Sequence, residues 1–173
     1  MTRTLLLLRH GKSDWGVGAV NDYARPLKQR GRKAARRIGI WLRSHDFLSP
    51  LIVSSGAARA RATAELVAEQ LGLAPTLVQF DDRVYEAAPD TLLEICRQSQ
   101  SRTRTLMLVG HNPGLEMLCE RLSAQPLASA SNGKLLPTAA LAVLPLRHDW
   151  ADLDTGVSEG AYVVRPRELS EAT

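Results

Sequence analysis

Four consecutive leucines, Leu5–Leu8, follow Thr4 and are closed at once by Arg9 and His10. Successive side chains of a strand point to opposite faces of its sheet, so an unbroken apolar run predicts a strand that is covered on both faces. Such strands belong mainly to parallel sheets between layers of helices. The run is also too short for a signal peptide. It therefore predicts a central buried strand that delivers polar residues at its carboxyl end.

Further short apolar runs alternate with segments of helical periodicity. We expect strands over residues 51–53, 76–80, 105–109, 139–144 and 161–164. Helices are expected from soon after Pro26 to about Ser44, over 57–71 with a stop at Gly72, over 89–98, and from Pro113 with Asn112 as its N-cap. This alternation predicts an α/β fold, a three-layer α/β/α sandwich with a mainly parallel central sheet. Residues 1–173 are expected to form one domain, since no repeat or linker interrupts the pattern.

The first expected helix combines an apolar stripe with a dense positive charge. Its inner stripe is formed by Ala34, Ile38, Trp41 and Leu42. Six of the ten residues in 28–37 are basic, and the chain has 22 Lys and Arg against 18 Asp and Glu. A positive balance favours anionic partners: a phosphorylated substrate, an acidic protein surface or nucleic acid. Because no aromatic platform accompanies these charges, a solvated helix face is preferred to a nucleic-acid-binding surface.

Several functional classes lack support in the sequence. Cys96 and Cys119 are widely spaced, so they are expected to be buried reduced thiols rather than a disulfide framework or a zinc knuckle. The segment Gly16–Gly18 has no third glycine at Asn21, which excludes the dinucleotide-binding fingerprint, and no P-loop motif occurs. No apolar run is long enough to span a bilayer. We therefore expect a cytoplasmic protein with no membrane partner.

Polar side chains follow three of the expected strands at the point where each strand ends. His10 follows the first strand, the pair Ser54 and Ser55 follows the second, and His111 follows the strand over residues 105–109. In open α/β sheets, functional sites form at the carboxyl ends of the strands. The sequence therefore predicts one site that brings these residues together.

The residues at this expected site fall into three motifs of a known superfamily. The strand and turn Leu5–Gly11 resembles the first motif of the histidine phosphatase, or phosphoglycerate-mutase-like, superfamily. The segment Ser55–Thr63 resembles the second motif, in which Arg59 stands four residues after a serine and four before a threonine. The segment Val109–Pro113 resembles the third, which supplies another histidine. The motifs occur in the order that the superfamily has, and each lies at a strand end.

A closer resemblance is to the small SixA-type branch, known for phosphohistidine phosphatase activity. The stretch Arg25-Pro26-Leu27 with Gly31 resembles the segment that follows the first motif in that branch, and further similarity lies in Tyr85–Ala87, Pro137-Thr138 and Arg165–Leu169. The resemblance covers nearly the whole chain. It implies a phosphoglycerate-mutase-like fold and substrate contacts from Arg9, Gly11, Arg25, Arg59 and His111.

The chemistry of phosphoryl transfer fits the implied roles. A phosphoryl group carries negative charge on its oxygens, and Arg9 and Arg59 can each present a planar fork to them. A neutral imidazole is a competent nucleophile near neutral pH, and flanking arginines favour that neutral form. We therefore expect His10 to form a phosphohistidine that water cleaves, while His111 donates a hydrogen bond to a phosphoryl oxygen. No cofactor or metal is expected, because the two histidines accompany arginines rather than carboxylates or cysteines.

The proton donor is the least constrained part of the expected site. Larger members of the superfamily place an acidic residue between the second and third motifs, and Glu86 is the nearest candidate here. The SixA-type branch need not have an acid at this place, and Asp81, Asp82 and Glu86 fit solvated loop charges equally well. A phosphohistidine substrate reduces the need for a donor, because an imidazole leaves more readily than an alkoxide.

The expected substrate is a phosphohistidine in a partner protein. Only 26 residues separate Arg59 from Glu86, which leaves little room for a lid over the site and disfavours a mutase. Three alternatives remain open: a phosphatase of small phosphate monoesters, a non-catalytic phosphoprotein-binding module, and a basic nucleic-acid-binding protein that uses residues 28–37.

Overall fold

A six-stranded mixed sheet forms the centre of the protein. The computed structural model describes residues 2–16, 18–48 and 50–169; Val17, in the expected glycine-rich loop, lies outside the described residues. The strands are β1 (Arg3–Arg9), β2 (Leu51–Ser54), β3 (Val78–Phe80), β4 (Thr105–Gly110), β5 (Leu141–Leu146) and β6 (Tyr162–Val164). Their order across the sheet is β3-β2-β4-β1-β5-β6. The pairs among β3, β2, β4 and β1 are parallel, whereas β5 and β6 add antiparallel pairs at one side.

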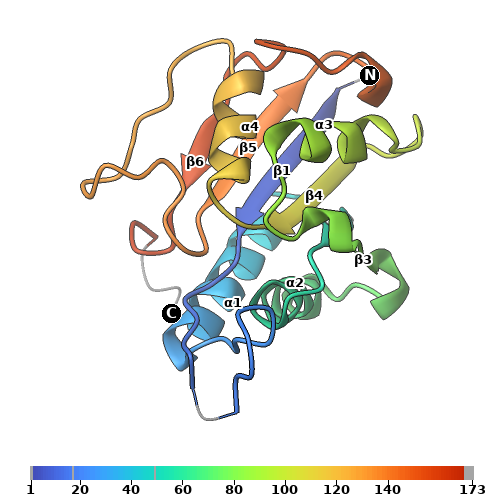
Figure 1. The fold of residues 1–173 in the computed structure, drawn as a ribbon. Helices are drawn as coiled ribbons and strands as arrows, with labels where there is room; N and C mark the ends of the chain where they lie inside the picture. Colours follow the sequence, from blue (N-terminus) through green and yellow to red (C-terminus); the bar gives the residue numbers. More distant parts are fainter. Residues whose placement is uncertain (1, 17, 49, 170–173) are drawn as a thin grey trace.

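Helices cover both faces of the sheet, which confirms the expected α/β sandwich. The helices are α1 (Gln29–Ser44), α2 (Ala58–Leu71), α3 (Pro89–Arg97) and α4 (Gly114–Leu122). Figure 1 shows α1 and α2 on one side of the sheet and α3 and α4 on the other. Short 3₁₀ turns occur at Pro75–Leu77, Asp82–Val84 and Trp150–Asp152.

The leucines of β1 connect the two helical layers. Leu5 and Leu7 pack in the apolar cluster that contains α3 and α4, whereas Leu6 and Leu8 pack in the cluster that contains α1 and α2. All four side chains are fully buried. An alternating strand with helices on both faces needs apolar residues at every position, which is the physical reason for the unbroken leucine run.

The differences from the expected elements are local. The segment expected as a strand from residue 76 begins with a 3₁₀ turn, so β3 contains only Val78–Phe80. On α1 the buried face contains Ala35 rather than Ala34, and Trp41 is only half-buried. The expected N-cap at Asn112 is wrong: its amide Nδ2 donates to the Leu136 carbonyl oxygen at 2.9 Å, and the α4 cap makes no side-chain hydrogen bond. By contrast, Gly72 ends α2 in the left-handed conformation, with φ of 65°, as expected for a helix stop.

Two glycines let the turn after β1 pack against the start of α1. A Cβ atom on Gly11 would lie 2.8 Å from the Gly31 carbonyl oxygen, and a Cβ on Gly31 would collide with the Lys12 backbone. Any other residue at either position would therefore force the turn away from the helix. This close approach fixes where His10 lies relative to α1.

The segment between β1 and α1 forms a closed loop over the carboxyl edge of the sheet. Ser13 and Leu27 pair as an isolated antiparallel bridge, which brings the two ends of the loop together. The loop is also attached to α2, because the Ala58 N–H donates to the Tyr23 carbonyl oxygen at 2.9 Å. These contacts place Asp22 and Arg25 above the strand ends. None of the helices in the described ranges is long and apolar enough to cross a membrane.

Candidate active site

His10 lies just beyond β1 with its side chain 7% exposed. Its backbone N–H donates to the Gly110 carbonyl oxygen at 3.0 Å, which attaches the histidine to the end of β4. The ring Nδ1 lies 2.7 Å from the Gly11 carbonyl oxygen. Because a carbonyl oxygen can only accept, Nδ1 carries the proton and Nε2 keeps its lone pair. The Arg59 Nε donates to that Nε2 over 3.4 Å.

Both site histidines are held in the neutral form. The pKa of His10 is lowered from 6.5 to about 3, mainly by burial, with His111, Arg59 and Arg9 acting in the same direction and the hydrogen bond to Gly11 acting against it. Burial also lowers the pKa of His111 from 6.5 to about 4, and Arg59 acts in the same direction. A neutral His10 with an unprotonated Nε2 has the electronic form that a nucleophile requires.

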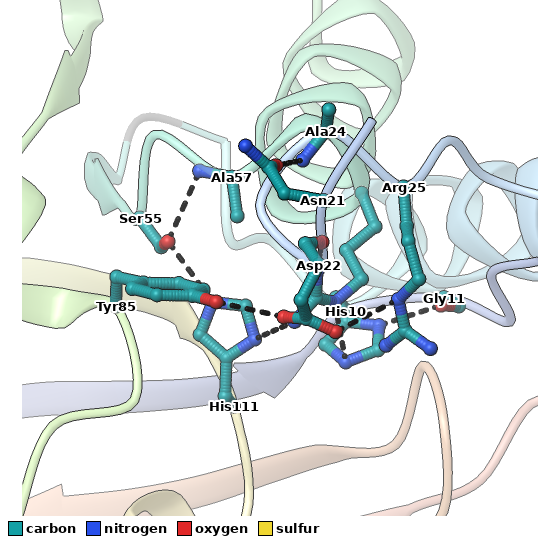
Figure 2. Close-up of polar contacts among 11 residues, drawn as sticks. His10, Gly11, Asn21, Asp22, Ala24, Arg25, Ser55, Ala57, Tyr85 and His111 are labelled. Carbon is teal, nitrogen blue, oxygen red and sulfur yellow. Dashed lines mark hydrogen bonds and ion pairs between the residues drawn. The ribbon is translucent and has the colours of Figure 1, made fainter. Parts of the chain in front are cut away.

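His111 follows β4 and lies beside His10, with ring centroids 5.1 Å apart. Its Nε2 lies 2.9 Å from the Ser55 Oγ, and its Nδ1 accepts from the Arg59 guanidinium over 3.4 Å. The Ser55 Oγ also accepts from the Ala57 N–H at 3.2 Å, so its hydroxyl can either accept from or donate to His111. The Nδ1 of His111 can therefore accept a hydrogen bond from Arg59, as it does here, or carry the proton and donate a hydrogen bond to an anion. Figure 2 shows this chain of contacts from Ala57 through Ser55 to His111.

Arg59, in the first turn of α2, connects the residues of the site. Its side chain is only 3% exposed. Besides its contacts to the two histidines, it donates through NH1 to the Asp22 carbonyl oxygen at 2.6 Å and through NH2 to the Asp22 carboxylate at 2.8 Å. A buried guanidinium requires an anionic partner, because an unpaired buried charge is costly. In this structure that partner is Asp22.

Asp22 places a carboxylate against Arg59, Arg25 and Tyr85 beside the two histidines. Its Oδ2 accepts from the Tyr85 hydroxyl at 2.7 Å, in addition to Arg59, and its Oδ1 lies 3.0 Å from the Arg25 Nε. In Figure 2 the carboxylate points towards His10 and His111. Burial raises the pKa of Asp22, but the hydrogen bonds from Tyr85 and Arg59 outweigh that effect and lower it overall. Asp22 is therefore an ionised carboxylate, and the hydrogen-bond donors around it could also hold another anion.

Arg9 lies at the end of β1 and is bound differently from Arg59. Its NH1 donates to the Leu136 carbonyl oxygen at 3.0 Å, and within the described ranges its buried Nε has no hydrogen-bond partner. Burial lowers its pKa, while the nearby Glu116 raises it. The charge of Arg9 lowers the pKa of both His10 and His111, so it acts on the same site as Arg59.

The remaining predicted site residues are Arg25, Gly11 and Glu86, and they differ in how they contact the residues around the two histidines. Arg25 joins it through Asp22 and also lies over the Trp15 ring, 5.2 Å from the centroid. The Gly11 N–H is directed to the Thr63 Oγ1 at 3.0 Å, which attaches the turn to α2. Glu86 is exposed, with a left-handed φ of 48°, and within the described part of the chain no hydrogen bond or ion pair connects it to either histidine.

The loop after β1 covers the site, whereas the sequence led us to consider only a lid between Arg59 and Glu86. Between Arg59 and Glu86 the chain forms α2, β3 and two 3₁₀ turns, with no inserted lid. Yet His10 and His111 are only 7% and 5% exposed. The Tyr85 ring lies 5.3 Å from that of His111, and Figure 2 shows Asp22 and Arg25, from the loop after β1, beside the two histidines. The expectation of an uncovered site therefore needs correction: a short loop, held to Arg59 by its carboxylate, provides the cover.

Asp22 is the site residue that sequence reasoning missed, whereas Ser55 was expected at the site without its hydrogen bond to His111. Asp22 is a single acidic residue in a polar loop, three residues before Arg25, and nothing in its spacing distinguishes it from a solvated charge. Ser55 appears in a motif, but its hydrogen bond to His111 depends on how β2 and β4 pair. Across the described residues, no three His, Cys, Asp or Glu side chains are placed to hold a metal ion.

Comparisons with known proteins identify the family of this chain. Residues 5–89 match the model of the histidine phosphatase superfamily (branch 1). An uncharacterized protein of Mycobacterium tuberculosis is 33% identical over 154 residues, which cover 86% of this chain and 93% of that protein.

Two solved structures of proteins assigned as the phosphohistidine phosphatase SixA are similar along most of the chain. The one from Agrobacterium tumefaciens is 30% identical, with a TM-score of 0.68, and the match covers 82% of this chain and 90% of that one. The one from Nakamurella multipartitia is 28% identical, with a TM-score of 0.74 and coverage of 95% and 94%. The similarity therefore extends beyond the region that the family model matches.

Proposed function

Since this chain belongs to the SixA-type branch of the histidine phosphatase superfamily, we propose that it dephosphorylates phosphohistidine in a partner protein through a covalent intermediate on His10. The observation that carries the proposal is the state of His10. Its Nδ1 proton is held by the Gly11 carbonyl oxygen, and its Nε2 lone pair faces the Arg59 guanidinium. A nucleophile and a cationic donor for phosphoryl oxygens therefore lie in contact.

In the first step, the Nε2 of His10 attacks the phosphorus of the substrate. A new N–P bond forms as the N–P bond to the substrate imidazole breaks, and that imidazole takes the bonding electron pair and then a proton from solvent. Arg59 and Arg9 supply positive charge to the phosphoryl oxygens. His111 donates from Nδ1 once Ser55 donates to its Nε2, a tautomer change that the hydroxyl permits.

In the second step, water attacks the phosphorus of phosphorylated His10. The N–P bond breaks, its electron pair returns to Nε2, and phosphate leaves with the oxygen of the water. The low pKa of His10 favours this step, because burial and the flanking arginines make its imidazole a good leaving group. All the positive charge in both steps comes from side chains, so we propose that the reaction is independent of metals.

The choice of phosphohistidine over a phosphate ester rests on the missing proton donor. An alkoxide leaving group needs an acid, whereas an imidazole needs much less assistance. Asp22 is ionised and Glu86 is exposed, so neither described carboxyl group is positioned as a protonated acid beside the site. Such a site suits the substrate with the easier leaving group.

Substrate binding must also separate Asp22 from Arg59. The carboxylate lies on the guanidinium edge that a phosphoryl group would use, and both anions cannot occupy it. A phosphoryl group, with more charge and more acceptor oxygens, replaces the carboxylate, and the loop that carries Asp22 moves outward. This movement uncovers His10 for a side chain on a folded partner.

The proposal is tested with a panel of substrates in the presence of a chelator. The panel contains a protein phosphorylated on histidine, free phosphohistidine, and glycerate and sugar phosphates, and phosphate release is followed for wild type, His10→Ala and His148→Ala. His148 is an exposed histidine outside the site and is the matched control. We expect the phosphoprotein to give the highest kcat/KM, with activity lost only in His10→Ala. A small ester that is hydrolysed at least tenfold faster would instead identify a monoesterase.

A further inference from the structure

A basic groove lies directly beside the candidate active site. It has a volume of about 580 Å³ and is bordered by the turn after β1, the first half of α1, the loop of residues 130–138 and the segment of residues 165–168. Eight of its lining residues are cationic: Arg9, Lys12, Arg30, Lys33, Arg37, Lys134, Arg165 and Arg167. Glu168 is its one acidic lining residue among those described. Segments far apart in the sequence thus contribute one sign of charge to a single hollow.

Two of the arginines that line the groove, Arg9 and Arg165, are largely buried. Arg165 has a side chain only 10% exposed, and its buried Nε has no hydrogen-bond partner among the residues that the structure describes. The buried Nε of Arg9 is also without a partner. Backbone carbonyl oxygens hold both guanidinium groups, Leu136 that of Arg9 and Leu135 that of Arg165, so their positive charge is fixed in place in the groove lining.

The groove and the active site share Arg9. This residue lines the groove, and its charge lowers the pKa of His10. A chain that occupied the groove could therefore present one of its residues to His10 without leaving it. Lys12, two residues after His10, extends the positive lining from the site into the groove.

We infer that this groove is the docking surface for an acidic segment that adjoins the phosphohistidine of the substrate protein. The inference rests on the proposed function, and it names the partner by its chemistry: several Asp or Glu residues beside the phosphorylated histidine. Hollows lined by one sign of charge concentrate the field and speed the arrival of an oppositely charged partner. None of the described lining residues is aromatic, so a stacked nucleic-acid strand fits the groove less well than carboxylates do.

The other large hollow differs from the groove. It has a volume of about 960 Å³ and lies where β2 and β4 begin, at the opposite edge of the sheet from His10. Asp46 and Asp81 line it together with Arg83, Arg102 and Arg104, so its charge is mixed. Arg102 is exposed and distant from the active site, which makes it a suitable control position.

The first test measures binding without catalysis. The probe is a fluorescent, unphosphorylated peptide with one histidine among glutamates, and its dissociation constant is measured by anisotropy. The groove variant is Arg30→Glu with Lys134→Glu, and the control is Arg102→Glu with Arg147→Glu, which changes the net charge equally. All four positions are exposed. We expect the groove variant to bind at least tenfold more weakly and the control to bind within about threefold of wild type, with affinity falling as salt rises.

The second test measures turnover. The same peptide, phosphorylated on its histidine, is compared with a version in which glutamines replace the glutamates, and p-nitrophenyl phosphate reports the active site alone. The groove variant should lose about tenfold in kcat/KM on the acidic peptide and keep its rate on p-nitrophenyl phosphate.

The outcomes separate the two proposals. If the groove and control variants lose the same affinity for the peptide, the loss is an effect of net charge, and the groove is not the docking surface. The docking surface is likewise overturned if neither variant loses affinity. A single-stranded oligonucleotide that binds the groove more tightly than the acidic peptide would overturn the choice of partner. If wild type hydrolyses p-nitrophenyl phosphate but neither phosphopeptide, the proposed function fails, whatever the binding measurement gives.

Discussion

Replacement of Asp22 by asparagine tests whether the protein holds an internal anion where the phosphoryl group binds. Asparagine keeps the size of the side chain and one acceptor oxygen, but it removes the negative charge. In the folded protein that charge faces Arg59 at 2.8 Å and Arg25 at 3.0 Å. Arg59 is 3% exposed, so water cannot replace its lost partner easily, whereas the Asp22 side chain is 33% exposed and partly screened.

The magnitude follows from these two exposures. A hydrogen bond to a charged group contributes about 1.5–3 kcal/mol, and solvent screening of Asp22 reduces the net value, so about 1–2 kcal/mol is expected for the Asp22–Arg59 contact. The same free energy has two effects. Without a bound anion, the free energy of unfolding of Asp22→Asn should be lower than that of wild type by that amount. An oxyanion no longer has to displace a carboxylate from Arg59, so it should bind to the variant about 5- to 30-fold more tightly.

The assay combines calorimetric titration of tungstate with thermal unfolding in its absence and presence. Asp22→Asn should have a lower Tm without tungstate and a larger rise in Tm with it than wild type. The control is Asp14→Asn, because Asp14 belongs to the same loop and pairs at 2.7 Å with Lys28, away from Arg59. Unchanged tungstate affinity in Asp22→Asn would refute the competition, and weaker affinity would mean that Asp22 orients Arg59 for the anion instead.

Three further predictions concern the site residues. Arg59→Ala should lower kcat/KM by about two to four powers of ten on every substrate, as a steady-state assay can check, because it removes the donor that contacts both histidines. Glu86→Gln should change kcat on a phosphohistidine protein by less than about threefold, and a hundredfold loss would identify Glu86 as the proton donor. The pKa values of about 3 for His10 and about 4 for His111 lie below the unfolded value of 6.5, so the unfolded chain binds more protons between these limits. Their contribution to the free energy of unfolding should be complete above pH 6.5 and fall as the pH drops towards 3. Denaturant titrations should show a smaller pH dependence in the double variant His10→Gln with His111→Gln than in wild type.

The sheet and the main site residues were predictable because local patterns determine them. The leucines of β1 need apolar neighbours on both faces, which specifies a central strand and places His10 at its carboxyl end. His111 follows from the same argument applied to β4. Arg59 lies in the first turn of a helix that directly follows β2, so its side chain reaches the same edge of the sheet.

The cover of the site was not predictable, because it depends on tertiary contacts of a loop without periodicity. Asp22 reaches Arg59 only because Ser13 and Leu27 close the loop and Tyr23 binds the start of α2. None of these contacts has a sequence pattern of its own. The basic residues of α1 show the same limit: their charge was evident, but the groove needs Arg165 and Lys134 from distant parts of the chain.

The central claim, that His10 carries the phosphoryl group, is tested most directly by trapping the intermediate. Wild-type protein is mixed with a radiolabelled phosphohistidine substrate, quenched within one turnover in alkali or in acid, and mapped by mass spectrometry. We expect label on a peptide that contains His10 after the alkaline quench, loss of that label in acid, and no label in His10→Ala, whereas His111→Ala should label the same peptide more slowly. Label that survives acid, that maps to another residue, or that persists in His10→Ala would contradict the account.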